Sequence, residues 1–250
     1  MAFEPQNDLE QSLMRAATDP AHRPQFYRDF LESDIFVIQA GPPDGESGPT
    51  TLESGYQLRI ESVKFNGKDC LPIFSSLPRL QAVLKSEATY LALNAREFLK
   101  ITSGADLVLN PGSPYGKEFT AAEIASLLDG SIWKPSQQYV AEENTQVMLG
   151  QPARYPEELV SALKRLFNNR YEVKRAWLAH YYNPKQAEKA HTLIAIETVR
   201  NFEQVASEAG IVANNVNVPD PPIDFVQITG KGGFEDYFLK SVEPFYKRSG

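Results

Sequence analysis

The sequence has few of the residues on which many enzyme classes depend. Cys70 is the only cysteine among 250 residues, which excludes an internal disulfide framework and a cysteine-rich metal site. The three histidines are His22, His180 and His191, and none has the H-x-x-x-H or H-E-x-x-H spacing of a metal motif. No apolar run approaches the roughly 18 residues of a membrane-spanning helix. These absences exclude several protein classes without naming an activity.

Positive charge is also scarce. The chain has 25 Lys and Arg residues against 32 Asp and Glu, a net charge of -7 with histidine neutral. A nucleic-acid backbone requires a basic binding face, so this balance argues against nucleic acid as the main partner. The first thirteen residues are acidic and polar, unlike a secretory signal. Together with the single cysteine, these features predict a protein of a reducing, bacterial-type cytoplasm that does not act at a membrane.

The length and the charge distribution indicate two domains. A chain of 250 residues suits one large domain or two of ordinary size. Residues 1–134 carry a net charge of -6, whereas residues 135–250 carry -1. A turn-rich passage at 129–136 follows a helical pattern. We therefore predict an N-terminal domain of residues 1–134 and a C-terminal domain of residues 135–250.

Helical and strand patterns alternate in both halves. Two helices come first, and Asp8 stands where a capping box would begin the first of them. Asn94 and Thr120, each followed three residues later by Glu, predict two further helix starts. The C-terminal half has the order β-α-β-β-α-β-α, the split βαβ pattern with one added helix. The predicted class is α+β or α/β: an N-terminal αα unit with a mixed sheet and helices, then a sandwich with helices on one sheet face.

Two glycine-bearing loops between a strand and a helix are the candidate binding sites. In the first, Asn-Pro and Pro-Gly steps enforce a rigid turn that presents polar groups beside a helix start. The second resembles an anion cradle in residue types but lacks the spacing of a nucleotide P-loop. A tight strand-to-helix connection is the simpler interpretation of both. The candidate ligand- or partner-binding residues are Asn110, Pro111, Gly112, Ser113, Gly116, Gly230, Lys231 and Gly232.

The remaining reactive residue types give weaker signals. Antiparallel pairing of two predicted strands could bring His180 and His191 together, with Glu188 or Glu197 as the third ligand that a metal needs. The simpler interpretation is two strand-end histidines that face water. Cys70 follows an acidic residue, which favours a small buried hydrophobe over a reactive thiol. We therefore predict no catalytic residues, no metal and no cofactor.

A basic cluster crosses from a predicted helix end to the next strand. A solvated face that compensates the helix dipole is the simpler interpretation, and a docking surface for an acidic partner is the alternative. The acidic N-terminal half could be that partner, in the same chain or in a neighbouring subunit. The cluster consists of Lys164, Arg165, Arg170, Lys174 and Arg175.

Three motifs in this order resemble the SseB family. They are Ile73-Phe74-Ser75-Ser76, Leu109-Asn110-Pro111-Gly112-Ser113 and Ala176-Trp177-Leu178-Ala179. The resemblance extends from about Leu9 to about Tyr246, and Ser75 stands where the family commonly has threonine. Members are called enhanced serine sensitivity proteins and have N-terminal and C-terminal SseB domains. The resemblance implies a two-domain cytoplasmic bacterial protein, and it supplies no catalytic residue or cofactor.

The absence of a catalytic motif beside two recognition-type loops favours a non-catalytic binding or regulatory protein with a protein partner. The alternative is a small-ligand sensor for amino acids, or an enzyme of amino-acid metabolism, and the family's serine phenotype motivates it. A subunit of a larger assembly, including a homo-oligomer, is a third interpretation. Convergence of Asn110, Ser113 and Lys231 on one pocket would favour the ligand interpretation.

Overall fold

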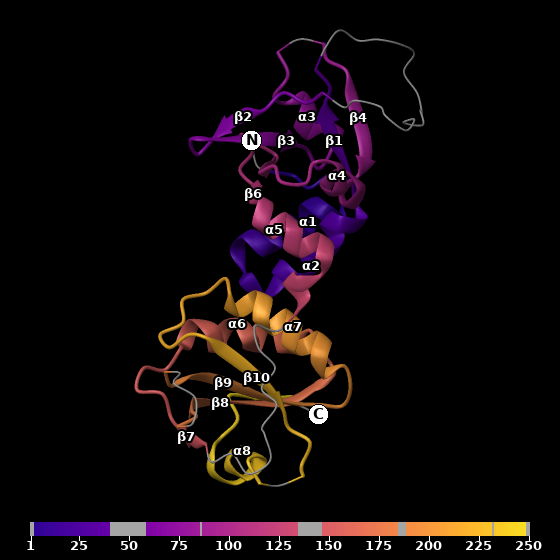
Figure 1. The fold of residues 1–250 in the computed structure, drawn as a ribbon. Helices are drawn as coiled ribbons and strands as arrows, with labels where there is room; N and C mark the ends of the chain where they lie inside the picture. Colours follow the sequence, from indigo (N-terminus) through magenta and orange to yellow (C-terminus); the bar gives the residue numbers. More distant parts are fainter. Residues whose placement is uncertain are drawn as a thin grey trace. The chain divides into compact units, whose positions relative to one another are not determined.

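The structure is a computed structural model that describes residues 3–40, 59–85, 87–134, 147–184, 189–231 and 233–248 (Figure 1). The chain forms two compact units. Unit 1 comprises Met1–Thr18 and Gln25–Asp129, and unit 2 comprises Asp19–Pro24 and Gly130–Gly250. Each unit combines helices with β-sheet, which confirms the predicted α+β class.

Unit 1 has two leading helices followed by a mixed sheet, as predicted. Strands β3 and β5 are parallel, whereas β2–β3, β5–β6 and β1–β4 are antiparallel. Reciprocal backbone hydrogen bonds of 2.8 and 2.9 Å between Phe36 and Phe74 join β1 to β3. The elements are α1 (Asp8–Thr18), most of α2 (Arg23–Glu32), β1 (Asp34–Ile38), β2 (Val63–Phe65), β3 (Lys68–Ile73), α3 (Leu77–Gln81), β4 (Tyr90–Asn94), α4 (Ala95–Ile101), β5 (Leu107–Leu109), β6 (Lys117–Phe119) and α5 (Ala121–Asp129).

Two of the predicted helix caps are confirmed. The side-chain oxygen of Asn94 accepts hydrogen bonds from the N–H groups of Arg96 (3.0 Å) and Glu97 (3.4 Å) at the start of α4. The hydroxyl of Thr120 accepts the N–H of Glu123 (3.2 Å) at the start of α5. These bonds satisfy N–H groups that have no partner within the helix.

The predicted cap of α1 is wrong by one residue. Asp8 is the first helical residue, and Asn7 caps the helix by accepting the N–H of Glu10 on its side-chain oxygen (2.9 Å). Asparagine and aspartate cap helices about equally well, so residue type alone does not choose between adjacent positions. The side-chain amide of Asn7 also donates to the carbonyl of Ser75 (2.7 Å), a tertiary contact that favours this position.

Unit 2 has the predicted order β-α-β-β-α-β-α, followed by a short strand that was not predicted. Strand β8 pairs with β9 on one side and with β7 and β11 on the other, and β10 extends the sheet parallel to β9. The elements are η1 (Pro20–His22), η2 (Ser131–Trp133), β7 (Met148–Gly150), α6 (Glu157–Asn168), β8 (Val173–Tyr182), β9 (His191–Thr198), α7 (Phe202–Ala213), β10 (Ile223–Gln227), α8 (Glu235–Ser241) and β11 (Tyr246–Lys247).

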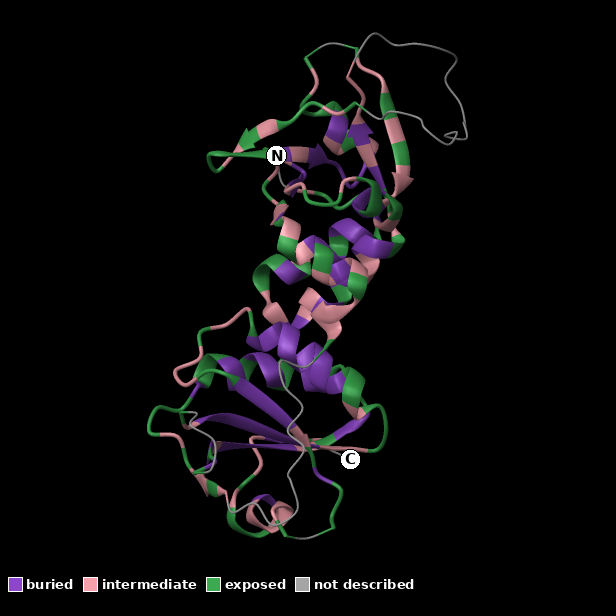
Figure 2. Ribbon diagram, in the orientation of Figure 1, coloured by how far each residue is buried: buried purple, intermediate pink, exposed green. Residues whose placement is uncertain are grey.

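Helices cover both faces of the unit 2 sheet, not one face as predicted. Leu178 and Ile194 belong to an apolar cluster with α6 and α7, whereas Trp177 and Leu193 pack with Phe238 of α8. Strands buried on both faces are apolar without alternation. Accordingly, β8 and β9 are buried over much of their length (Figure 2).

Six residues from the N-terminal half of the sequence belong to unit 2. Ala21 is part of the apolar cluster with α6 and α7, and Asp19 forms an ion pair with Arg165 of α6 (2.7 Å). Burial opposes ionisation of Asp19, but the N–H of Ala21 and the guanidinium of Arg165 hold its pKa below the ordinary value. A carboxylate from the acidic half is therefore the partner of Arg165 within the same chain.

Tyr246 and Arg248 form hydrogen bonds with the C-terminal end of α6 and the residues that follow it. The guanidinium of Arg248 donates to the carbonyls of Phe167 (3.0 Å), Arg170 (2.5 Å) and Val173 (3.0 Å), and the hydroxyl of Tyr246 also donates to Phe167 (3.0 Å). The last carbonyls of a helix have no partner within the helix, and a cation there complements the helix dipole. These bonds join the two-residue strand β11 to the end of α6 and to the segment before β8.

Replacing Arg248→Ala should lower the free energy of unfolding of unit 2 by about 2 kcal/mol, because charge-assisted bonds to three carbonyls are lost. Both tryptophans lie in unit 2, so urea unfolding followed by tryptophan fluorescence measures this loss. Lys247→Ala is the control, since the neighbouring lysine is exposed. Equal stability of the two variants would contradict the interpretation.

Candidate functional site

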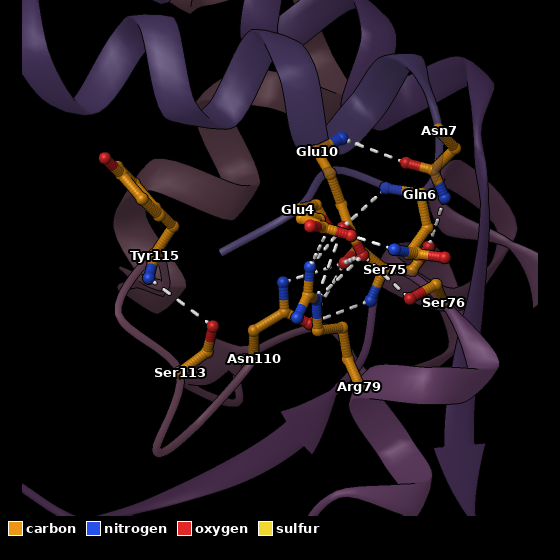
Figure 3. Close-up of polar contacts among 10 residues, drawn as sticks. All are labelled: Glu4, Gln6, Asn7, Glu10, Ser75, Ser76, Arg79, Asn110, Ser113 and Tyr115. Atoms are coloured by element: carbon orange, nitrogen blue, oxygen red, sulfur yellow. Dashed lines mark hydrogen bonds and ion pairs between the residues drawn. The ribbon is translucent and has the colours of Figure 1, made fainter. Parts of the chain in front are cut away.

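The carboxyl ends of the parallel strands β3 and β5 bring the first candidate loop against the Ser75-Ser76 turn (Figure 3). The N–H of Asn110 donates to the carbonyl of Ile73 (2.8 Å), and the N–H of Ser75 donates to the side-chain oxygen of Asn110 (2.9 Å). In α/β sheets, ligands commonly bind at this end of the strands. The two N-terminal motifs that resemble the SseB family therefore meet at one place.

The side chain of Asn110 forms its hydrogen bonds within the protein. Its backbone has a left-handed φ of +52°, and its side-chain amide donates to the hydroxyl of Ser75 (2.7 Å). The side chain is almost completely buried. Further along the loop, a Cβ at Gly116 would lie 2.7 Å from the carbonyl oxygen of Leu109, which requires glycine there. These residues shape the turn and present few groups to an external ligand.

The carboxylate of Glu10 lies at the strand ends and is completely buried. One oxygen accepts hydrogen bonds from the hydroxyls of Ser75 (2.8 Å) and Ser76 (2.7 Å). The other accepts from the guanidinium of Arg79 (2.9 Å) and the N–H of Gln6 (3.0 Å). This is the donor set that an anionic ligand would require. The chain's own carboxylate fills the place of such a ligand.

The protonation state of Glu10 follows from these donors. Burial by itself raises the pKa of a carboxyl group. The guanidinium of Arg79, the hydroxyls of Ser76 and Ser75 and the N–H of Gln6 outweigh burial and hold the pKa of Glu10 below its ordinary value. Glu10 is therefore a buried anion at neutral pH, paired with a partly buried cation.

The first residues of the chain close over this ion pair. The guanidinium of Arg79 lies 3.7 Å from the ring centroid of Phe3 and donates to the carbonyl of Glu4 (2.5 Å). The ring of Phe3 in turn packs edge-on against Tyr115 of the candidate loop, with 4.9 Å between centroids. The cluster joins the N-terminal segment, α3 and the loop after β5 into one structural unit.

The second candidate loop also binds an anion of the chain itself. The carboxylate of Glu235 accepts the N–H groups of Thr229 (3.0 Å), Gly230 (2.5 Å) and Lys231 (3.1 Å), and the hydroxyl of Thr229 (2.9 Å). Burial opposes ionisation, but these donors hold the pKa of Glu235 below its ordinary value. Gly232 lies outside the described residues. The N–H groups of this loop therefore do bind an anion, and that anion is the carboxylate of Glu235.

The two candidate loops belong to different compact units. Asn110 and Ser113 lie in unit 1, whereas Lys231 lies in unit 2. Each loop is held by partners from its own unit. The hydroxyl of Ser113 accepts only a long hydrogen bond from the N–H of Tyr115 (3.4 Å). Neither unit alone combines the three residues in one site.

The two strand histidines lie on opposite faces of the sheet. His191 is directly opposite Tyr181, and His180 is the next residue along β8, so its side chain points to the other face. The expectation that both face water is wrong for His191, which is buried with its Nε2 2.9 Å from a carboxylate oxygen of Asp224. The register of the strands therefore excludes a metal site shared by these two side chains.

The other reactive residues are also used internally or buried. Glu197 pairs with Arg175, and Glu188 lies outside the described residues. Among the residues that the structure describes, no three His, Cys, Asp or Glu side chains are grouped to hold a metal ion. Burial, with Glu118 and other acidic neighbours, raises the pKa of the buried Cys70 thiol, as expected for an unreactive thiol.

Most of the basic cluster is paired within the chain. Its three arginines form the pairs Arg165–Asp19, Arg170–Glu208 and Arg175–Glu197. Glu208 is completely buried, so its pair with Arg170 is part of the core of unit 2. Compensation by internal carboxylates accounts for this cluster better than a free basic surface.

Comparison with known proteins matches both halves of the chain. The model for the SseB protein N-terminal domain matches residues 9–126, and the model for the SseB protein C-terminal domain matches residues 141–248. The chain belongs to the SseB family. It is 33% identical over 247 residues to Protein SseB of Escherichia coli (strain K12) and to Protein SseB of Shigella flexneri, a match that covers 98% of this chain and 93% of each relative. No solved structure matches.

The match confirms the family resemblance inferred from the three motifs. In the part of this SseB-family chain that the structure describes, no helix is long and apolar enough to cross a membrane. The chain is thus similar to the curated SseB proteins along nearly its whole length.

Sequence reasoning missed Glu10 and Arg79 as members of the central cluster. Two local signals were present: Glu10 lies three residues after the capping Asn7, and Arg79 lies three residues after Ser76. Both spacings place a side chain back over the start of its own helix. Nothing in the sequence showed that the two helix starts face each other.

Replacing Glu10→Gln should lower the free energy of unfolding by about 3 kcal/mol, because Arg79 then lacks a countercharge in a mostly buried place. Urea unfolding followed by far-UV circular dichroism measures the loss. Glu4→Gln is the matched control, because that residue is exposed and contributes its backbone carbonyl to the cluster. A loss of similar size in the control would refute a specific role for Glu10.

Acid should remove the contribution of Glu235 to stability. The pKa of Glu235 is lower in the folded protein than in the unfolded chain. Its contribution is therefore full above the unfolded value of about 4.5 and is lost as pH falls through the folded pKa. Wild type should therefore exceed Glu235→Gln by about 1 kcal/mol at pH 7 and by progressively less toward pH 3.

Tryptophan fluorescence across a pH series of urea titrations tests this prediction for unit 2. The control is Asp236→Asn, which removes an exposed carboxylate that pairs with Lys240 on the same helix. A difference between wild type and Glu235→Gln that stays constant with pH would argue against ionisation as its source.

Proposed function

We propose that this SseB-family protein is a non-catalytic binding or regulatory protein of the cytoplasm that acts through a protein partner. The proposal rests on one observation: the polar side chains at the candidate sites bind one another instead of facing an external ligand. The strand-end site is filled by Glu10, and the anion cradle of unit 2 is filled by Glu235. Groups that would otherwise bind or transform a substrate instead hold the fold together.

The surroundings of two reactive side chains, Ser75 of unit 1 and His191 of unit 2, support this proposal. A nucleophile needs an accessible atom and a base that can take its proton. The hydroxyl of Ser75 is completely buried and donates to a carboxylate. Both ring nitrogens of His191 face oxygen atoms, Nδ1 at 3.2 Å from the carbonyl of Lys189 and Nε2 at 2.9 Å from Asp224. Neither group is placed to act on an external substrate.

The amino-acid sensor or metabolic enzyme has less support. Its candidate residues Asn110, Ser113 and Lys231 do not belong to one compact unit, and the best-formed donor cradle has an internal occupant. A protein partner also agrees with the net charge of -7, which disfavours nucleic acid and anionic membrane surfaces. Self-association into a homo-oligomer is one form that such a partnership can take.

Affinity capture with chemical crosslinking from a lysate of the producing bacterium should recover a reproducible, near-stoichiometric protein partner. Mass spectrometry of the crosslinks would also show whether the partner is a second copy of the chain. The Glu4→Gln protein serves as a matched control that should recover the same partner, because the substituted side chain is exposed. Absence of a partner across growth conditions, together with a thermal shift of several degrees with a free amino acid, would favour the sensor instead.

A further inference from the structure

His191 and Asp224 form a buried pair between the parallel strands β9 and β10. The two residues are only 2% and 3% exposed. His191 is the first residue of β9, and Asp224 lies on β10 in register with Leu193. Residues two apart in a strand share a face, so both side chains of the pair lie on the face that carries Leu193. The Nε2 atom of His191 is 2.9 Å from a carboxylate oxygen of Asp224.

Both nitrogens of the His191 ring face oxygen atoms at hydrogen-bond distance. Nδ1 is 3.2 Å from the carbonyl oxygen of Lys189, and Nε2 faces the carboxylate of Asp224. A carbonyl oxygen only accepts hydrogen bonds, so Nδ1 carries a proton. A second proton lies between Nε2 and the carboxylate, because two facing lone pairs would repel each other. The pair thus holds two protons, and its net charge is zero whichever residue carries the shared proton.

The surroundings of the pair favour this neutral state. Tyr181 and Leu193 pack with Phe238 in the apolar cluster on this face of the sheet. The second carboxylate oxygen of Asp224 is buried and has no hydrogen-bond partner among the described residues. Loss of the shared proton to solvent would leave a net negative charge in this place, and burial of an unpaired charge is costly.

The neighbouring strands supply no buried cation to offset that negative charge. Tyr181 of β8 is directly opposite His191, with 5.2 Å between the ring centroids, and its phenol is uncharged at neutral pH. Lys189 is an exposed residue. His180 points to the opposite face of the sheet, where its Nε2 is 3.9 Å from a carboxylate oxygen of Asp220.

The charged residues of α8, which packs on the same face, have partners of their own. Glu235 accepts the N–H groups of the loop after β10, and Asp236 pairs with Lys240 on the exposed side of the helix. The residues that β7 and its preceding segment add to this face are the apolar Val147 and Leu149.

We propose that His191 and Asp224 form a proton-binding site that makes the stability of unit 2 depend on pH in the neutral range. In an unfolded chain, histidine loses its second proton near about pH 6.5, and aspartate is ionised above about pH 3.9. Above about pH 6.5, the two residues therefore hold one proton in the unfolded chain and two in the folded protein. Folding takes up one proton from solvent, so stability falls as pH rises. Between the two values both states hold two protons, and the contribution is complete.

Asp224→Asn removes the proton-binding site and keeps its shape. The asparagine amide can donate to Nε2 of a neutral His191, while Nδ1 still donates to the carbonyl of Lys189. Urea unfolding of the full-length proteins from pH 7 to pH 9, followed by tryptophan fluorescence, compares this variant with wild type. The unfolding equilibrium constant of wild type should rise more steeply, by up to about tenfold per pH unit, because one more proton is released on unfolding.

His180→Gln is the matched control, because it removes the neighbouring imidazole on the opposite face of the same strand pair. It should keep the pH dependence of wild type, since groups common to the proteins cancel in the comparison. Equal pH dependence of wild type and Asp224→Asn would overturn the proposal. Loss of the dependence in His180→Gln would also overturn it, because the proton would then belong to another site.

Nitrogen-15 NMR of the histidine rings in the wild-type protein is a second test that does not need a folded variant. At about pH 7.5, Nδ1 of His191 should give the signal of a protonated nitrogen, whereas a histidine that binds Asp224 through Nε2–H alone has a bare Nδ1. A bare Nδ1 would overturn the proposal whatever the urea titrations show.

Discussion

The buried carboxylate of Glu10 is the interaction on which the architecture of unit 1 depends. Removing an ionised carboxylate from water costs several kcal/mol after relaxation, and hydrogen bonds must offset that cost. Its donors come from three separate parts of the chain: the N-terminal segment, the turn after β3, and α3. Because the charge needs all of them, it fixes where the first helix lies against the sheet.

The same solution recurs in unit 2, where Glu235 neutralises the N–H groups of the loop after β10. In both units, the place at the end of a strand where other α/β proteins bind an anion is filled by a carboxylate of the chain. The hydrogen-bond donors at both places are satisfied. A free anion would have to displace Glu10 or Glu235, which the chain itself holds in place. The two strand-end donor sets are therefore poor candidates for binding a free anion.

Much of the fold could be predicted from the sequence, and the errors share a cause. The order of elements in unit 2, the mixed sheet of unit 1 and the caps at Asn94 and Thr120 were all predicted from local patterns. The sequence did not reveal that α8 packs on the second sheet face, or that His180 and His191 point to opposite faces. A shift of one residue in strand register reverses every face. Because β8 and β9 are buried on both faces, their apolar residues do not alternate and do not specify that register.

The sequence by itself determined the local structures and the family. Helix caps, glycine turns and alternating elements depend on residues a few positions apart, and the three motifs identified an SseB-family chain. Only the tertiary structure decided which charges meet. Glu10 and Ser75 are 65 positions apart, and Asp19 and Arg165 are 146 apart. The physical reason is that desolvation makes a buried charge depend on its partners in space, and chain neighbours do not specify those partners.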